Sequence, residues 1–447
     1  MPSRADRPLL QPRLLMIAVA VLLAAGFCLT LLIFYPGVMT YDAKFVYEDI
    51  AKGTMGDWQS PVMVWLWGVI DPIAPGAGSM FLLIAATYWA GFAVLSLALA
   101  SRGKAGALLL PLLAMTPPAL AFAGIIWRDV LFATCWLSAA SVAFAVSERQ
   151  SPLRLAGQGL ALVLLIVGVL LRPNALLAAP ILAAYIIWLS RISLRKTAIL
   201  YVPAMLMLFG IVQLTYYGML HAKRQHPLQT IMIFDLGGIS HFAKQNQFPV
   251  TWNESESAML LNGCYQPTMW DIYWRLKPCD FVMGKVERET GLFGTPAIQS
   301  AWMKAVLHHP IAYLQHRSAF TWNFLAGDNL GMWTADVEHP MQKVFADRAS
   351  FNTLVAAHDA LKPTPFLRAG FWLLLCIVVC GWSGKRRAAR EAAFALAVCG
   401  SATVYVLSFY ALGVASDFRY GYWAVLAAMA GVVVAASSEG RATDPQG

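Results

Sequence analysis

The stretch LLMIAVAVLLAAGFCLTLLIF, residues 14–34, contains no charged side chain. A helix needs about 20 apolar residues to cross the hydrocarbon core of a bilayer, and this stretch is long enough. It is too long for the apolar core of a signal peptide, and no small-residue cleavage site follows it. We therefore expect a retained first transmembrane helix that ends at Pro36-Gly37.

The rest of the chain repeats this pattern. Hydrophobic residues make up 59% of the 447 residues and charged residues 13%, whereas about a quarter of an average soluble protein is charged. This composition predicts an all-α polytopic membrane protein with about ten transmembrane helices. We place them at 14–35, 78–101, 105–123, 129–147, 155–171, 174–190, 197–219, 366–382, 391–412 and 418–437.

The distribution of lysine and arginine predicts the orientation. Cytoplasmic loops of membrane proteins carry an excess of these residues, so the net charge of +9 indicates topology rather than a nucleic-acid surface. Alternate loops are basic, which places both termini in the cytoplasm and residues 36–75 and 223–365 outside. The basic loops and tails hold Arg4, Arg7, Arg13, Arg102, Lys104, Arg149, Arg154, Arg191, Arg195, Lys196, Lys385, Arg386, Arg387, Arg390 and Arg441.

Three parts follow from this topology. Residues 1–222 hold helices one to seven and the long first loop 36–75, residues 223–365 form an extracytoplasmic domain, and residues 366–447 hold the last three helices and a tail. Within the first loop, the apolar run 62–70 is too short to span and lies among tryptophans. Tryptophan favours the head-group level, which predicts an interfacial or re-entrant helix there.

The domain 223–365 contains two features of its own. Cys264 and Cys279 are the only cysteines outside the predicted spans. On an oxidising face such a pair favours a disulfide, and half of a zinc site is the alternative. The segment WMKAVLHHPIAYLQHRSAFTWNF, residues 302–324, predicts an amphipathic helix on the membrane. Its histidines are ligands, acid–base groups or, more simply, interfacial polar residues: His308, His309 and His316.

Asp42 follows the end of the first helix within a few residues. Shielded by aromatic residues, its carboxyl would have a raised pKa, which suits a general base toward an acceptor hydroxyl or amine. A helix N-cap is an equally good interpretation of this position. Asp57, in the turn GDWQSP, either orients the loop, binds substrate or only serves the turn.

Three arginines stand at the extracytoplasmic ends of predicted helices, against the charge bias: Arg128, Arg172 and Arg419. Guanidinium groups match phosphate geometry with two parallel hydrogen bonds, so these residues, with Lys44, are candidates for holding a phosphate at the head-group level. Simpler alternatives remain open. Arg128 can pair with Asp129 and Arg419 with Asp417, or each can extend to lipid phosphates.

Nucleotide-binding motifs are absent from the sequence. There is no GxxxxGK[ST] and no GxGxxG that follows a strand. An enzyme with an outward-facing polar cluster and no nucleotide site would have to draw on an activated lipid. We therefore expect no nucleic-acid partner and no nucleotide donor.

Six short motifs together resemble the GT-C superfamily of integral membrane glycosyltransferases, which use polyprenyl-phosphate-linked sugars. The chain is similar to bacterial relatives of the dolichyl-phosphate-mannose protein mannosyltransferases. The motifs are FYPGVMTYD (34–42), GDWQSPVMVWLWG (56–68), WRDVLFA (127–133), LRPNALLAAP (171–180), HPIAYLQHR (309–317) and DFRYGYW (417–423). The resemblance implies a GT-C-like helical fold with an extracytoplasmic domain between helices seven and eight.

The resemblance also implies roles. The acidic residue of the first loop would be the catalytic base, which falls on Asp42, and basic residues on the same face would bind the lipid phosphate. Relatives often read Asp-x-His-Pro-Pro where this chain has DWQSP (57–61), and no metal or other cofactor is predicted. The other candidate substrate contacts in and beside these motifs are Lys44, Asp57, Gln59, Asp129, Asn174 and Tyr420.

The favoured hypothesis is a polyprenyl-phosphate-sugar-dependent glycosyltransferase in a bacterial inner membrane, with its active site on the extracytoplasmic face. The acceptor would be a cell-envelope glycan, a lipid or a protein. A transporter or flippase of lipid-linked glycans is the first alternative, but transporters place ionisable residues near the bilayer midplane. A polymerase of lipid-linked repeat units and a non-catalytic membrane scaffold are the others.

Overall fold

The computed structural model describes residues 11–189, 194–327, 345, 348–385 and 389–438. Six of the arginines used to predict the topology lie outside these residues: Arg4, Arg7, Arg191, Arg386, Arg387 and Arg441. Within the described residues the protein is helical, and no β-sheet forms; extended segments meet only in isolated bridges. The predicted all-helical architecture is thus observed.

Within the described residues, seven helical segments are long and apolar enough to cross a membrane. They are α1 (Pro12–Phe34), α4 (Ala77–Ala100), α7 (Arg128–Val146), α8 (Leu153–Leu171), α10 (Leu194–Gln213) with the following turn Leu214–Met219, α19 (Arg390–Leu412), and α20 (Tyr422–Ala436) with the preceding turn Phe418–Gly421. The chain is an integral membrane protein of the polytopic α-helical type.

The remaining three predicted spans are shorter or broken. The segment 105–123 forms α5 (Leu109–Ala114) after the turn Ala105–Leu108, and then α6 (Pro117–Ala123), with a bend of 56° between the two parts. Pro117 and Pro118 lack the N–H groups that would continue the preceding helix. The segment 174–190 reduces to α9 (Ala179–Trp188), and 366–382 shifts to α18 (Ala369–Gly384). In the part of the chain that the structure describes, seven segments meet the length and composition criterion, or eight if the bent pair is one span, and the count of ten stays a prediction.

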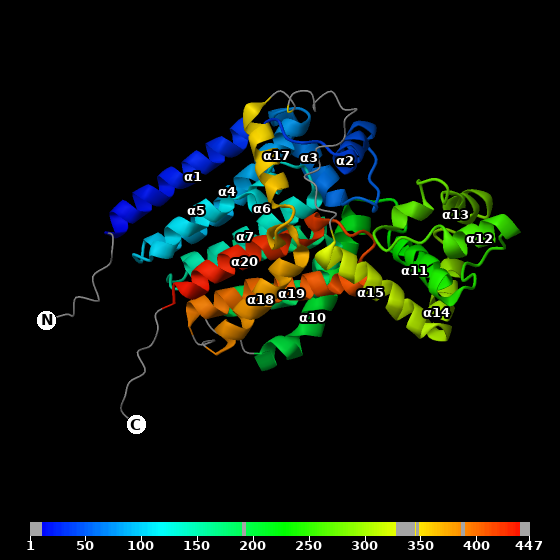
Figure 1. Ribbon diagram of the computed structural model, residues 1–447. Helices are drawn as coiled ribbons and strands as arrows, with labels where there is room; N and C mark the ends of the chain where they lie inside the picture. Colours follow the sequence, from blue (N-terminus) through cyan, green and yellow to red (C-terminus); the bar gives the residue numbers. More distant parts are fainter. Residues whose placement is uncertain (1–10, 190–193, 328–344, 346–347, 386–388, 439–447) are drawn as a thin grey trace.

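The centre of the bundle is built on α7 and α20, the most enclosed candidate spans. Helix α7 packs against α4, α8 and α20, and α20 packs against α18 and α19. Helix α10 lies at the outside, with most of its apolar side chains exposed, as suits a helix that faces lipid. Figure 1 shows the long helices side by side, with the helices of residues 228–326 gathered beyond one end of the bundle.

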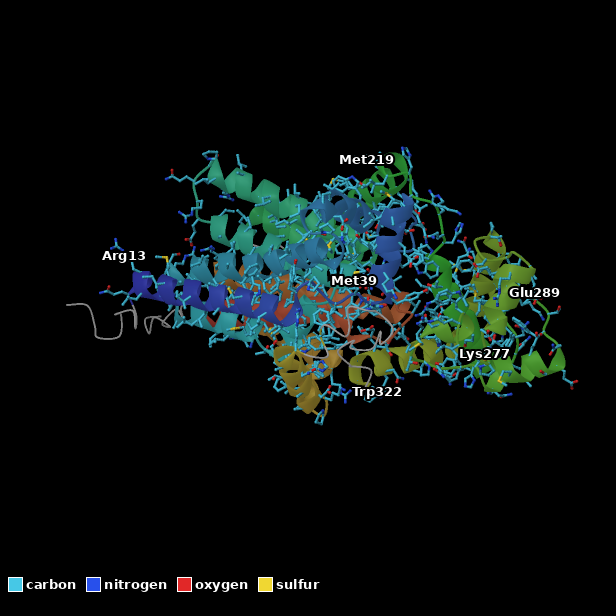
Figure 2. The ribbon with its side chains drawn as sticks, turned by 90° about the horizontal axis from the view of Figure 1, so that it is seen from above. Arg13, Met39, Met219, Lys277, Glu289 and Trp322 are labelled. Atoms are coloured by element: carbon cyan, nitrogen blue, oxygen red, sulfur yellow. A yellow bond between two sulfur atoms is a disulfide. The ribbon has the colours of Figure 1, made fainter. Side chains whose placement is uncertain are left out.

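Charged side chains mark the other end. Arg102 lies 2.8 Å from the Glu148 carboxylate and Arg390 lies 3.0 Å from it. These residues come from three loops that the charge distribution places on one side of the membrane. Figure 2 shows Arg13, near the start of α1, at the opposite end of the molecule from Lys277 and Glu289. The structure therefore has two chemically distinct ends, and their assignment to compartments stays a prediction.

The first loop, residues 36–75, folds over the end of the bundle that lies opposite Arg13. Gly37 follows α1 with a φ of +111°, a conformation that suits glycine, and an added Cβ would lie 2.6 Å from Phe81 Cβ. Helix α2 (Tyr41–Lys52) comes next, and α3 (Pro61–Ile70) begins at the Ser60 cap, whose hydroxyl accepts from Met63 N–H. Helix α3 occupies the apolar run where an interfacial or re-entrant helix is predicted.

Between α10 and α18 lie α11 (Leu228–Ala243), α12 (Glu254–Asn262), α13 (Phe281–Met283), α14 (Pro296–His308), α15 (Pro310–Ala326) and α17 (Ala349–Leu361). A disulfide joins Cys264 to Cys279. Helix α17 packs against α6 and α1 rather than against α11–α14. The described part of the segment between α10 and α18 is therefore divided between a compact helical cluster and a helix on the bundle.

The prediction of a single amphipathic helix over residues 302–324 is wrong. Two helices meet there at His309, because Pro310 begins α15 and cannot continue α14. His316 is not an interfacial group either. It is fully buried, with its Nε2 3.4 Å from Asp235 Oδ1, and the neighbouring Arg317 Nε lies 2.7 Å from the same oxygen.

Candidate functional site

Two extended segments bring the motifs of the first loop and of α7 together. Val38 N–H donates to Gly124 C=O at 2.9 Å, and Ile126 N–H donates to Val38 C=O at 3.0 Å. Thr40 then caps α2, where its hydroxyl oxygen accepts from Ala43 N–H and from the Trp127 indole, the latter at 2.8 Å. These contacts fix the start of α2, and hence Asp42, beside the start of α7.

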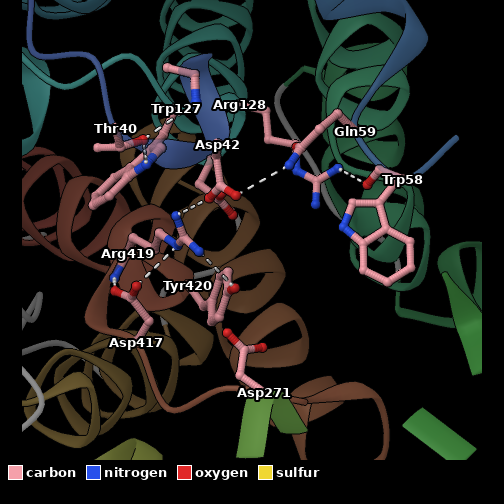
Figure 3. Close-up of polar contacts among 12 residues, drawn as sticks. Thr40, Asp42, Trp58, Gln59, Trp127, Arg128, Asp271, Asp417, Arg419 and Tyr420 are labelled. Carbon is pink, nitrogen blue, oxygen red and sulfur yellow. Dashed lines mark hydrogen bonds and ion pairs between the residues drawn. The ribbon is translucent and has the colours of Figure 1, made fainter. Parts of the chain in front are cut away.

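Asp42 is held by one arginine and one amide. Arg419 Nη1 lies 2.6 Å from Asp42 Oδ2, and the Gln59 amide donates to Asp42 Oδ1 at 3.2 Å. The Asp42 side chain is 35% exposed. The cap of α2 is Thr40, so the interpretation of Asp42 as an N-cap is wrong. Figure 3 shows the carboxylate between Arg419 and Gln59.

The electrostatic surroundings of Asp42 also correct an expectation. Burial acts to raise the pKa of the carboxyl, but the positive charges of Arg419, Arg128 and Arg172 outweigh it and lower the pKa below its ordinary value. The raised pKa expected from sequence is therefore wrong, because aromatic shielding was predicted without the arginine that binds the carboxylate. In this arrangement Asp42 is a stable anion and a weak base.

The three predicted arginines converge on this site from three elements. Arg419 lies 3.1 Å through Nε from Asp417 Oδ2, and its guanidinium sits over the rings of Trp127 and Tyr420, at 4.7 and 5.1 Å from the ring centres. Arg172 forms a buried ion pair with Asp129 at 2.6 Å, and its guanidinium lies over the Tyr420 ring, 4.7 Å from the ring centre.

Arg128 differs from the other two. Its Nη1 donates to the Trp58 carbonyl at 3.1 Å, and no carboxylate of the described residues lies within ion-pair distance of it. The suggestion from the sequence that Arg128 pairs with Asp129 is therefore wrong, because Asp129 pairs with Arg172 instead. The Arg419–Asp417 pair is present. Arg128 thus places a positive charge at the site without a carboxylate in direct contact.

These side chains surround a narrow pocket. Its cavity is about 10 Å³, room for about one water molecule. Polar side chains and the indole of Trp127 form one part of its wall, and α2, α3 and Ile126 supply the apolar part. The lining residues are Asp42, Ala43, Val46, Gln59, Met63, Ile126, Trp127, Arg128, Asp129, Arg172, Arg419 and Tyr420.

Three predicted substrate contacts lie outside this lining: Lys44, Asp57 and Asn174. Asp57 has a positioning role instead. It accepts from Tyr217 OH at 2.7 Å and from Gln225 N–H at 2.6 Å, and so ties the first loop to the segment after α10. Gly56 allows this approach, because an added Cβ would lie 2.0 Å from Gln225 Oε1.

Sequence reasoning missed the aromatic part of the site. Trp127 supports both Thr40 and Arg419, although only its neighbours in the motif WRD were singled out. Trp58 contacts Trp270 and Trp274, with ring centres 5.8 and 6.4 Å away. The last two tryptophans lie within the disulfide-closed loop. The clustering of tryptophan around two polar motifs was the available signal.

The connection into the last helix is held by the same loop. Trp270 N–H donates to Val414 C=O at 2.8 Å and Ser416 N–H donates to Thr268 C=O at 2.7 Å. The residues immediately after this pairing are Asp417, Arg419 and Tyr420. The position of Arg419 therefore depends on the domain between α10 and α18 as well as on the bundle.

No metal site is evident within the described part of the chain. No group of three or more His, Cys, Asp or Glu side chains is placed there to hold a metal ion. The carboxylates near the pocket face arginines instead.

Comparison with known proteins gives fold-level neighbours only. No family model matches this sequence, and no curated protein matches it. Among solved structures, the chain is similar to the oligosaccharyltransferase AglB from Archaeoglobus fulgidus in complex with an inhibitory peptide and a dolichol-phosphate, with 12% identity and a TM-score of 0.39. The apo form of the Archaeoglobus fulgidus oligosaccharyltransferase gives the same values.

Each of these alignments covers 93% of this chain and 50% of the solved one, so the chain spans about half the length of its structural neighbours. Both neighbours are oligosaccharyltransferases. At this identity and TM-score, the similarity does not indicate an activity for this chain.

Proposed function

We propose that the protein is a membrane glycosyltransferase that takes a sugar from a polyprenyl-phosphate-linked donor at the end of the bundle where α2, α7 and α20 meet. The observation that supports this most directly is the convergence of Arg128, Arg172 and Arg419 with Asp42 on one pocket. Guanidinium groups suit a phosphate that must be held and then stabilised as it departs.

The donor phosphate would lie against Arg128 and Arg419, the two arginines whose positive charges act most strongly on Asp42. Arg172 is already satisfied by Asp129 in a buried ion pair. It would contribute positive charge and hold Tyr420, over whose ring it lies. The polyprenyl chain would run into the bilayer, where exposed apolar side chains of the outer helices face lipid.

The proposed reaction is a direct displacement with inversion. The acceptor hydroxyl oxygen attacks the anomeric carbon and forms the new C–O bond. The bond from that carbon to the phosphate oxygen breaks, and the phosphate leaves with the electron pair. Asp42 takes the proton of the acceptor hydroxyl, as a general base within reach of the pocket.

The position of the charges favours an enzyme over a transporter. Arg128 begins α7, Arg172 follows α8, and Arg419 lies in the turn before α20. Transporter sites typically lie near the bilayer midplane, at broken helices. A charged site at the bundle end suits chemistry on a head group instead.

Replacing Asp42 with Asn tests the proposal. The amide keeps the shape of the carboxylate but cannot accept the proton, so sugar transfer should fall by about a hundredfold or more. The assay would use the full chain in native membrane vesicles, which retain the endogenous acceptors, with a panel of added polyprenyl-phosphate sugars, and would count the sugar transferred. Glu48→Gln is the matched control, because Glu48 lies on the same helix and only pairs with the exposed Lys52.

Two results would contradict the proposal. Transfer by the folded Asp42→Asn protein at the wild-type rate would remove Asp42 from the reaction. Absence of transfer by the wild-type protein with every donor of the panel would remove the donor class.

A further inference from the structure

Asp42 and the phosphate of the proposed donor would both bind the guanidinium of Arg419. Arg419 Nη1 lies 2.6 Å from Asp42 Oδ2, in the pocket where the donor phosphate would have to reach Arg419. A carboxylate bound in this way is also a poor base, because accepting a proton would break its ion pair. The resting arrangement is therefore closed to the donor and unfavourable for catalysis at the same time.

The pocket holds little free space in this arrangement. It leaves room for roughly one water molecule between its lining side chains, and Asp42 Oδ2 already occupies the position beside Arg419 Nη1. A phosphate oxygen that binds at this position would displace the Asp42 carboxylate.

Arg419 is the less free of the two partners. Its Nε faces Asp417 Oδ2 at 3.1 Å, its backbone N–H donates to Asp417 Oδ1 at 3.0 Å, and its Nη2 donates to Tyr420 OH at 3.1 Å. The guanidinium also lies over the Trp127 ring, and the side chain is 16% exposed. These contacts remain if Asp42 leaves.

Asp42 is held by fewer contacts. Apart from Arg419, its carboxylate accepts only the 3.2 Å hydrogen bond from Gln59 among the hydrogen bonds of the described residues, and it is 35% exposed. It stands in the first turn of α2, whose cap is formed by Thr40, so the helix start does not depend on Asp42. A rotation about its side-chain bonds would leave the backbone of α2 in place.

We propose that the donor phosphate replaces Asp42 on Arg419, and that this exchange releases the carboxylate to serve as the base. This inference rests on the proposed function and adds an order to it, in which the donor binds before the acceptor loses its proton. Arg128, which has no carboxylate in contact among the described residues, would meet the incoming phosphate first.

The charges around Asp42 are compatible with such an exchange. It faces Arg419 from the turn before α20, Arg128 from α7, Arg172 after α8 and the neutral Gln59 before α3. A phosphate between Arg128 and Arg419 would neutralise the two positive charges that most strongly hold Asp42 ionised. The released carboxylate would then face a less positive environment and bind a proton more readily.

The exchange predicts that removing the carboxylate strengthens binding of a lipid phosphate. The measurement is the Kd of undecaprenyl phosphate, which carries no sugar, for the full chain in nanodiscs. Asp42→Asn and Asp42→Ala should each bind about tenfold more tightly than the wild type, because neither competes for the Arg419 guanidinium as an anion. Glu48→Gln removes one negative charge from an exposed site on the same helix and should leave the Kd unchanged.

A double-mutant cycle separates competition from a general charge effect. Arg419→Gln should weaken binding by about tenfold or more. In the Arg419→Gln background, Asp42→Asn should no longer tighten binding, since the group for which Asp42 competes is gone. Retention of the helical circular dichroism signal in each variant would show that the fold is intact.

The outcomes distinguish the two proposals. If Arg419→Gln weakens binding but Asp42→Asn and Asp42→Ala leave it unchanged or weaker, the exchange is overturned and the phosphate site stands. If Asp42→Asn tightens binding equally with and without Arg419, the effect is one of general charge and the exchange is again overturned. If neither Arg419→Gln nor Arg128→Gln affects binding, the proposed function itself fails.

Discussion

Both ends of the helical bundle place arginines beside carboxylates, but the two clusters differ in what surrounds them. At one end, Arg102 and Arg390 meet Glu148, whose side chain is 64% exposed, and both arginines lie over the Phe144 ring. At the other end, Asp129 and Arg172 are buried together, and Asp42 and Arg419 meet within a pocket lined by aromatic rings.

The two clusters differ in how far their charged groups are exposed to solvent and in whether each arginine has a carboxylate partner. An exposed carboxylate between two arginines is hydrated and screened, and such pairs contribute little to stability. At the pocket, Asp129 and Arg172 lie in a low-dielectric setting where each charge must be satisfied, and Arg128 is left with a backbone carbonyl as its partner. We infer that the arginines beside Glu148 help to set the orientation of the chain in the membrane. The arginines around the pocket are arranged to bind an anionic ligand.

The largest expected difference between the two ends is the side of the membrane on which each is exposed, and this effect is all or none. Cysteines introduced as Glu48→Cys and Glu148→Cys, in a background without the five free cysteines, report the two ends. The distribution of Lys and Arg predicts that a membrane-impermeant maleimide added to intact cells labels position 48 and not position 148. Labelling of 148 alone would reverse the assigned compartments, and labelling of both in intact cells would contradict a bundle that spans the membrane.

The next largest difference should appear in stability. Arg172→Met leaves Asp129 buried without its partner, and breaking a buried pair in this way costs about 3–5 kcal/mol. Arg102→Met removes an ion pair to an exposed carboxylate and should cost about 1 kcal/mol or less. Denaturant unfolding of the purified variants in detergent measures both values, and equal costs would show that the two clusters do not differ in kind.

Arg172→Met in combination with Asp129→Leu serves as the control. Replacing both partners by apolar groups removes the unpaired buried charge and should recover much of the lost stability. Failure of the double variant to recover would indicate that Arg172 is needed for packing against Tyr420 rather than for its charge.

The smallest expected effect is a pH dependence at the pocket. Arginine charges lower the pKa of Asp42 despite its burial. A carboxyl with a lowered folded-state pKa contributes stability that is fully present above its unfolded pKa and is lost as the pH falls through the folded value. The stability difference between wild type and Asp42→Asn should thus be constant from about pH 5 to 8 and shrink only below the ordinary value of 3.8.

Unfolding measured across this range tests that expectation. A difference that already disappears between pH 5 and 7 would show that the carboxyl is protonated far above its ordinary range, contrary to its ion pair with Arg419.

Much of the fold follows from local sequence. Apolar runs of membrane length determine where α1, α4, α7, α8 and α19 lie, because hydrocarbon requires every backbone polar group to be satisfied within the helix. Two predicted helices are each divided in two, at Pro117 and at Pro310, because proline lacks the backbone N–H group that would continue the preceding helix. The lengths of α9 and α18 were not predictable in the same way, since turns at Pro173 and Pro365 replace their first residues.

For the site, the sequence by itself determined which residue types gather at one end. Asp42, Arg128, Arg172 and Arg419 each stand at the boundary of an apolar segment, and the alternation of basic loops places them on a common side. Residue type and helix polarity are local properties, so they could be identified without knowing how the helices pack.

Only the tertiary structure decided which charges meet. Asp129 turns from its chain neighbour Arg128 to Arg172, and Asp42 meets Arg419 from the opposite end of the chain. Ion pairing depends on distances of a few ångströms, which helix packing and the pairing of residues 268–270 with 414–416 determine. The direction of the pKa shift at Asp42 depends on the same distances, and for that reason the sequence predicted the residue but not its state.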